Sequence, residues 1–368
     1  MNSPEASSLP DYHDVLLWTT RHAARWKSTA ADFQVDEIFQ PQLDPRGEQV
    51  LLQVEKSGQN THWVAREVAR FAGVRDLDVA YLGMKDRQAV TRQYFSIYFG
   101  GRPEPDWTTL ALPGVSVRFV GRIARKLRRG EHAGNRFRVV VRFPAPGEVG
   151  ALSSAAVEDI GKKLRYLQES GFPNAFGPQR FGTRDENVVK AAAWLSSRRR
   201  LRDRHLQGIH LSAIRASFFN ATLKERIRRS AWNLLLPGDT PVAAACCSLA
   251  PEPRDRCLVP AGTLPGDSRF GAGLRGEIER QVAAPAMQLL EGLHAMGVRS
   301  QNRALVARCA DLEWHWQELS RLTLSFTLGV GCYASTFLDQ LFLLNDCAED
   351  DLEGEYQPGT TSEAPFIQ

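Results

Sequence analysis

The residue in this sequence with the clearest capacity for chemistry is Asp86, which lies in the stretch GMKDRQAVTRQ (83–93). A carboxylate can attack or deprotonate a bound substrate without the help of a cofactor. Lys85, Arg87 and Arg92 stand close to it in the chain, and opposite charges within several ångströms favour the ionised form of a carboxylate. The pattern is compatible with an ionised, catalytic aspartate, although the residue types alone favour a structural one. The alternative is an aspartate that caps a turn or a helix ahead of RQAVT.

Other sequence patterns argue against several kinds of reaction centre. The six cysteines form no zinc-ligand spacing, and His205 and His210 are five residues apart, which does not place both on one helix face. The chain contains neither GxGxxG nor GxxxxGK[ST], so no phosphate-binding loop for a nucleotide cofactor is indicated. No second carboxylate lies at a spacing that supports a two-carboxylate glycosidase. We therefore expect no metal and no cofactor.

Positive charge is concentrated in two stretches, 121–138 and 196–205, although the formal net charge of the chain is only +4. Each stretch is interrupted by apolar residues, and the end of the chain, 345–368, is acidic and rich in turn-forming residues. Two basic patches with an acidic tail favour a body that binds a polyanion and a disordered end. The alternative for each basic stretch is a solvated helix face.

Two further stretches could contact RNA. The loop GFPNAFGPQRFG (171–182) has a backbone restricted by glycine and proline, and it can either stack on bases and hold phosphates or pack between domains. In GNRF (134–137), Asn135 could read a base edge and Phe137 could stack on an extruded base, worth about 1 to 3 kcal/mol. The alternative is that Phe137 is a core residue of an alternating strand.

The elements that must position these residues follow from hydrophobic periodicity. Alternation predicts strands at 32–39, 48–57, 92–99, 115–123 and 135–143, and helical spacing predicts helices at 60–74 and 153–171. Further along the chain, we expect helices within 187–236, a loop at 258–277, and then a strand, a turn and a helix near the end. This order indicates an α+β fold: a mixed, mainly antiparallel sheet interrupted by a largely helical insertion.

Nothing in the sequence indicates a membrane protein. No apolar run approaches the roughly 20 residues that span a bilayer, and the N-terminal stretch is polar and acidic rather than signal-like. We expect a cytoplasmic protein with no membrane partner, and we favour a monomer.

Three motifs in one order give the chain a specific resemblance. GMKDRQAVTRQ (83–93), KLRRGEHAGNRF (126–137) and PNAFGPQRFG (173–182) resemble the GxKDxxAVTxQ, KLxxGxxxGNxF and PNxFGxQRFG motifs of the TruD-type tRNA pseudouridine synthases. Weaker similarities include KSTAADFQVDE (27–37) and GVGCYAS (329–335). The chain departs from the family close to Lys27, where AADF replaces PEDF.

The resemblance implies an enzyme that isomerises uridine to pseudouridine in tRNA, at position 13 if the usual target of the family holds, without a cofactor. It implies a discontinuous catalytic domain (1–170 and 309–345), an inserted domain (171–308) and a tail (346–368). Asp86 would be catalytic, as nucleophile or as base. The remaining site residues would be Lys27, Phe33, Asn135 and Phe137 for the substrate and Arg125, Lys126, Arg128, Arg129, Gln179 and Arg180 for RNA.

Two other classes of protein remain as alternatives. A non-catalytic tRNA-binding protein or RNA chaperone could keep the fold, although the intact KDRQAVT stretch argues against it. An RNA methyltransferase lacks support because no glycine-rich cofactor loop follows a strand.

Overall fold

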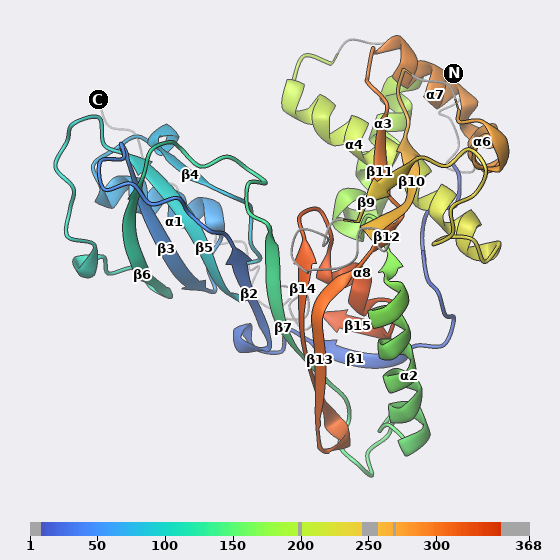
Figure 1. The fold of residues 1–368 in the computed structure, drawn as a ribbon, viewed down its shortest axis with the longest axis horizontal. Helices are drawn as coiled ribbons and strands as arrows, with labels where there is room; N and C mark the ends of the chain where they lie inside the picture. The colour runs from blue at the N-terminus through green and yellow to red at the C-terminus, as the bar shows by residue number, and fades with distance from the viewer. Residues whose placement is uncertain (1–8, 198–200, 245–256, 268–269, 347–368) are drawn as a thin grey trace, which may run out of the picture.

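A computed structural model describes residues 9–197, 201–244, 257–267 and 270–346 of the chain. The predicted acidic tail lies outside these residues except for its first position. Figure 1 shows three groups of elements: strands with the helix α1 on the left, long strands with the helix α2 at the lower right, and a mainly helical group at the upper right. One ten-stranded sheet joins the first two groups.

The large sheet is mixed, with the strand order β13-β14-β7-β2-β5-β3-β6. The pairs β2–β5 and β1–β15 are parallel, and the other pairs are antiparallel. Off the main path, β1 pairs with β15 and β7, and β4 pairs with β5. The strands are β1 His22–Trp26, β2 Phe33–Ile38, β3 Gln49–Ser57, β4 Val79–Tyr81, β5 Val90–Tyr98, β6 Val115–Ile123, β7 Gly134–Arg142, β13 Cys309–Gln317, β14 Arg321–Gly329 and β15 Phe342–Asp346. This architecture confirms the predicted α+β class.

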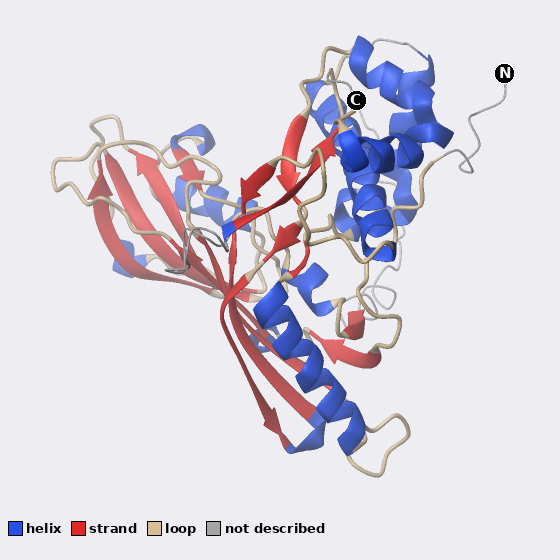
Figure 2. Ribbon diagram, turned by 45° about the vertical axis from the view of Figure 1, so that its right-hand side comes forward, coloured by secondary structure: helices blue, strands red, loops and turns tan. Residues whose placement is uncertain are grey.

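Helices cover the apolar face of the sheet and create two cores. The helix α1, Thr61–Phe71, packs Val64 and Val68 against β3 and β5. The helix α2, Ser154–Ser170, lies along the long strands of the lower half (Figure 2), where it forms a core with β7, β14 and the short helix α8, Ala334–Leu338. Period-two alternation in the strands and 3.6-residue spacing in the helices produce these two apolar faces.

The ends of α2 follow the predicted signals. The Ser153 side chain accepts a hydrogen bond from the Ala156 amide at the N-terminus, and Gly171 follows the last turn with φ of +79°. A Cβ at Gly171 would lie 2.5 Å from the Ala307 carbonyl oxygen, so both the backbone angle and the close approach require glycine.

Residues 171–308 separate the strand β7 from the strand β13 and contribute no strand to the large sheet within the described residues. The described residues of this segment form a three-stranded sheet with the order β11-β10-β9, a two-stranded pair β12-β8, and the longer helices α3, α4, α6 and α7. The elements are β8 Phe172–Pro173, α3 Glu186–Ser197, α4 Arg204–Arg228, β9 Pro241–Ala243, β10 Leu258–Leu264, α6 Gly273–Ala283, α7 Met287–Ala295, β11 Gln301–Ala304 and β12 Val306–Ala307. The helices predicted within 187–236 are confirmed as α3 and α4.

The loop predicted at 258–277 is wrong, because this range contains the strand β10 and the start of α6. The glycines and prolines that suggest a loop have packing roles here. Gly262 faces Leu305 and Phe219, where a Cβ would lie within 3 Å of both side chains, and the Pro260 carbonyl accepts a hydrogen bond from the Leu305 amide. Tertiary packing therefore overrides the local turn signal. The strand, turn and helix expected near the end are present as β14, a turn at 330–331 and α8, and the strand β15 follows them.

Candidate active site

Asp86 lies in the loop between β4 and β5, and its carboxylate is paired with Lys27. The Lys27 ammonium donates to Asp86 Oδ2 at 2.9 Å, and the side chains are 10% and 42% exposed, respectively. Lys27 itself has φ of +51° and lies against two rings, with Nζ 4.3 Å from the Trp26 centroid and 4.7 Å from that of Phe33. Cation–π contacts therefore hold the ammonium beside a carboxylate that solvent can still reach.

The cations that neighbour Asp86 in the chain have other partners, so they do not pair with its carboxylate. The Lys85 ammonium pairs with Glu37 at 2.7 Å, and both side chains are buried. Arg87 donates to the Gly58 carbonyl, and Arg92 donates to Glu55 at 2.8 Å. Sequence neighbours on a turn and a strand point in different directions, so the ionic partner of Asp86 is instead Lys27, the residue that follows β1.

The backbone around Asp86 is anchored at two consecutive residues. The Lys56 ammonium donates to the Asp86 carbonyl oxygen at 2.8 Å, and the Lys85 amide donates to Thr61 Oγ1 at 3.0 Å. Thr61 in turn donates to Gln93 Oε1 on β5 at 3.0 Å. The loop is thus fixed to the end of β3, the start of α1 and the strand β5.

Buried ionisable groups lie beneath this loop. Burial raises the pKa of Glu37, opposed by the charge of Lys85 and by hydrogen bonds from the Lys85 ammonium and the Tyr94 amide. Burial, aided by the charge of Lys85, lowers the pKa of His132 to about 4. His132 is therefore neutral at pH 7, and its Nδ1 has no hydrogen-bond partner among the described residues.

The expected substrate residues from β2 and β7 share one face of the sheet. The register pairs Val35 with Phe137 and Glu37 with Asn135 across these strands. Phe33 and Phe137 are 4% and 7% exposed, and Phe137 stacks on Phe326 with ring centroids 5.3 Å apart. Asn135 Oδ1 is buried and has no hydrogen-bond partner in the described part of the chain. The structure thus brings Lys27, Phe33 and Asp86 together, and Phe137 lies next to Phe33 on the same face of the sheet.

The comparisons identify the family. Residues 16–198 and 187–341 match the model of the family described as tRNA pseudouridine synthase D (TruD). The chain belongs to the TruD family. It is 37% identical over 324 residues to the tRNA pseudouridine synthase D of Nitrosococcus oceani, covering 84% of this chain and 88% of that protein. It is 34% identical over 338 residues to that of Cellvibrio japonicus, covering 89% and 92%.

A solved structure supports the fold as well. The TruD protein of Methanosarcina mazei superimposes with a TM-score of 0.67 at 20% sequence identity, covering 89% of this chain and 95% of that chain. The TruD resemblance drawn from three motifs is therefore confirmed across most of the chain.

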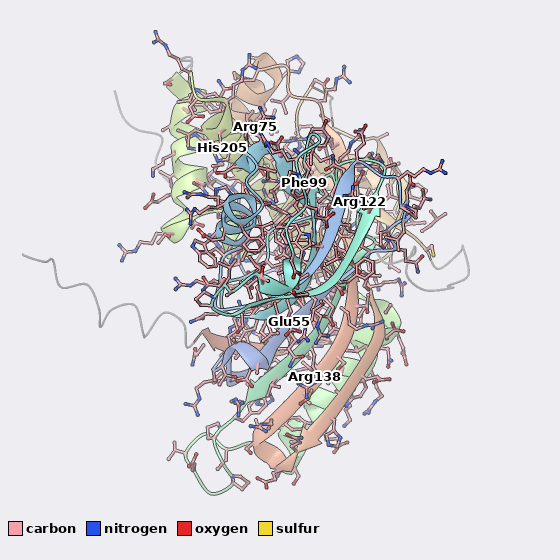
Figure 3. All side chains as sticks on the ribbon, turned by 90° about the vertical axis from the view of Figure 1, so that its left-hand side faces the viewer. Glu55, Arg75, Phe99, Arg122, Arg138 and His205 are labelled. Atoms are coloured by element: carbon pink, nitrogen blue, oxygen red, sulfur yellow. The ribbon has the colours of Figure 1, made fainter. Side chains whose placement is uncertain are left out.

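The second TruD motif forms an exposed basic loop next to the loop of Asp86. The Gly130 amide donates to the Leu82 carbonyl at 2.9 Å and joins the two loops. The four basic residues expected to contact RNA are all exposed: Arg125, Lys126, Arg128 and Arg129. Two other cations of the basic stretch lie outside this loop, since Arg122 is on β6 and Arg138 is on β7. Figure 3 shows these two residues well apart.

The third TruD motif, PNAFGPQRFG (173–182), lies where residues 171–308 meet the large sheet. Asn174 is buried and accepts hydrogen bonds from Arg303, which also donates to the Gly331 carbonyl ahead of α8. Arg180 donates to Ser212 on α4 and to the Tyr333 hydroxyl at 3.0 Å. These contacts favour the packing interpretation for most of the motif, whereas Gln179 is exposed.

The described residues contain neither a cluster of metal-ligating side chains nor a membrane-spanning helix. No three His, Cys, Asp or Glu side chains gather closely enough there to hold a metal ion. None of the described helices has the length and apolar character needed to span a membrane.

Sequence reasoning missed several residues that shape this TruD site: Glu37, Lys56, Thr61 and His132. A usable signal existed for Lys56, since a lysine at the end of an alternating apolar strand falls on the buried face. Nothing in the sequence could reveal the Lys85–Glu37 pair, because its members are far apart in the chain and meet only through the β2–β5 pairing.

Proposed function

We propose that this protein converts uridine to pseudouridine at position 13 of tRNA, with Asp86 acting at the ribose. The reaction breaks the bond between N1 and C1′, turns the uracil and forms a bond between C5 and C1′. The hydrogen on C5 is released and N1 gains one, so atoms balance without a redox change or a cofactor. The observation that carries the proposal is the partly exposed Asp86 carboxylate held by Lys27 at 2.9 Å in a TruD chain.

The surrounding residues suit the handling of an extruded base. Unstacking a nucleotide costs a few kcal/mol, which contacts in the site must offset. The buried Asn135 Oδ1, which has no partner among the described residues, can accept a hydrogen bond from uracil N3–H. Phe137 lies in the same strand with its ring buried against Phe326, and Phe33 fixes Lys27. Asp86 acts as nucleophile or as base, and either role uses its ionised form.

We further propose that residues 1–170 and 309–345 form the catalytic domain and residues 171–308 an inserted domain, with the tRNA held between them. The exposed cations at 125–129 would contact phosphates on one side, and the exposed Gln179 would contribute from the other. Arg180, which donates to Ser212 and Tyr333, would hold this loop in place. We also propose that the protein acts on tRNA in the cytoplasm.

The test uses purified protein and tRNA transcripts labelled with tritium at uridine C5. We expect tritium release from a transcript with uridine at position 13 and none from an otherwise identical transcript with cytidine there. Release from both transcripts would contradict the choice of position. Binding without release from either would favour the non-catalytic tRNA-binding protein.

A further inference from the structure

Lys56 is a fully buried lysine that contacts the peptide of Asp86. Lys56 is 0% exposed, and its ammonium donates to the Asp86 carbonyl oxygen at 2.8 Å. Lys56 lies at the end of β3, where the register pairs it with Thr91 on β5 and with Val115 on β6. Lys56 therefore reaches the Asp86 loop from β3 and binds its main chain, whereas Lys27 binds the carboxylate.

A buried ammonium is costly to keep, so this position calls for an explanation. Burial lowers the pKa of Lys56 to about 8, with the charge of Asp86 opposing this change and the charge of Lys85 adding to it. Charged groups taken out of water lose several kcal/mol unless polar partners replace the water. The partner that the structure provides at hydrogen-bond distance is the main chain of Asp86, and not a carboxylate side chain.

The Asp86 side chain cannot be fixed by packing, because it is 42% exposed. Its direction depends on the backbone that carries it and on the hydrogen bond from Lys27. Lys56 holds the carbonyl of Asp86, which belongs to the 86–87 peptide group, and Thr61 holds the amide of Lys85, which belongs to the 84–85 peptide group. The backbone is therefore held on both sides of the peptide group between residues 85 and 86. Catalytic groups need such support to stay within about 0.5 Å of the productive geometry.

We propose that Lys56 is a positioning residue for the catalytic aspartate, and that it anchors the Asp86 peptide together with Thr61. Lys56 contacts Asp86 through the main chain and is buried away from the substrate, so it acts on the chemical step rather than on tRNA binding. This inference rests on the proposed catalytic role of Asp86.

The test compares Lys56→Met with Lys163→Met in the full-length protein. Lys163 is the matched control, since it is also a buried lysine whose ammonium donates to a main-chain carbonyl, that of Thr20, at 2.8 Å, although it pairs with Asp159 as well. Both variants lose a buried charge, but only Lys56 touches the catalytic loop. Tritium release from labelled tRNA gives kcat and KM separately, and thermal unfolding gives the folded fraction.

We expect kcat of Lys56→Met to fall by about 100-fold, because a misplacement near 1 Å costs about that much in rate. The KM for tRNA should stay within about twofold of the parent value, and Lys163→Met should keep the parent kcat. A parent-like kcat in Lys56→Met, or an equal loss of kcat in both variants, would overturn the positioning role.

A second variant keeps the proposal testable if Lys56→Met does not fold. Thr61→Val is close in shape and removes the acceptor of the Lys85 amide, so we expect the same lower kcat with a parent-like KM. An unchanged kcat in folded Thr61→Val would overturn the anchoring role. If the parent protein itself forms no pseudouridine, the proposed function fails instead, and the two failures are thereby distinguished.

Discussion

Replacing Lys27 by methionine separates the chemical role of the Lys27–Asp86 pair from its structural role. The substitution removes the ammonium that lies 2.9 Å from Asp86 Oδ2 and keeps an unbranched chain between the Trp26 and Phe33 rings. A hydrogen bond to a charged group contributes about 1.5 to 3 kcal/mol. Because the Asp86 side chain is 42% exposed, water screens the pair, and the lower part of that range, a loss of about 10- to 30-fold in kcat/KM, is expected.

Stability should respond much less than activity. The loss of two cation–π contacts is offset by the removal of a charge that is only 10% exposed, so we expect the free energy of unfolding to change by less than about 1 kcal/mol. The control is Lys162→Met, which breaks an exposed pair with Glu158 at 2.8 Å far from Asp86 in the chain. Tritium release and urea unfolding measure the two quantities. A kcat/KM within twofold of the parent in Lys27→Met would refute the assigned role of the ammonium.

Three further predictions concern pH, salt and backbone strain. The pKa of His132 in the folded protein is about 4, against an ordinary 6.5. The neutral imidazole therefore contributes up to about 3 kcal/mol to the free energy of unfolding above pH 6.5, and this contribution is lost as the pH falls to 4. Urea unfolding of the parent and of His132→Gln across this pH range measures the difference. Replacing Arg128 and Arg129 by alanine should reduce the slope of the logarithm of the tRNA association constant against the logarithm of the salt concentration by about 1 to 2. The control Arg138→Ala should leave this slope unchanged in the same filter-binding titration. Gly171→Ala should cost at least about 2 kcal/mol in unfolding free energy, because a positive φ and the Ala307 carbonyl both oppose a Cβ.

Each of these predictions has a result that contradicts it. An identical pH dependence of stability in the parent and in His132→Gln would show that this imidazole does not titrate as described. The same salt slope in the Arg128 and Arg129 double variant as in the parent would mean that these two arginines do not contact phosphates of the tRNA. A parent-like unfolding free energy in Gly171→Ala would mean that the α2 terminus can rearrange without cost.

The sequence was sufficient for the parts of the site that local patterns encode. The strands that carry Phe33 and Phe137 follow from period-two alternation, and Asp86 was found from its residue type and the motif around it. Its partner Lys27 was expected in the site only through the resemblance. The cations next to Asp86 in the chain are not the partners of its carboxylate, because Lys85 and Arg92 pair with carboxylates on neighbouring strands.

The rest of the site depends on contacts between segments that are distant in the chain. Lys56 and Thr61 reach the Asp86 loop because β3 and α1 pack beside β5, and no local pattern specifies that distance. The strand β10 shows the same limit in the fold, since Pro260 and Gly262 resemble loop residues until the contact with Leu305 is known. Packing decides such positions, and a single sequence does not contain the packing partners explicitly.

The central claim, that Asp86 performs the chemistry on a bound tRNA, is tested most directly by Asp86→Asn. Asparagine keeps the size of the side chain and removes the charge, so the Kd for tRNA should stay within about threefold of the parent value, while tritium release from C5-labelled tRNA should fall below detection. Substantial tritium release by the folded variant would contradict the catalytic assignment of Asp86.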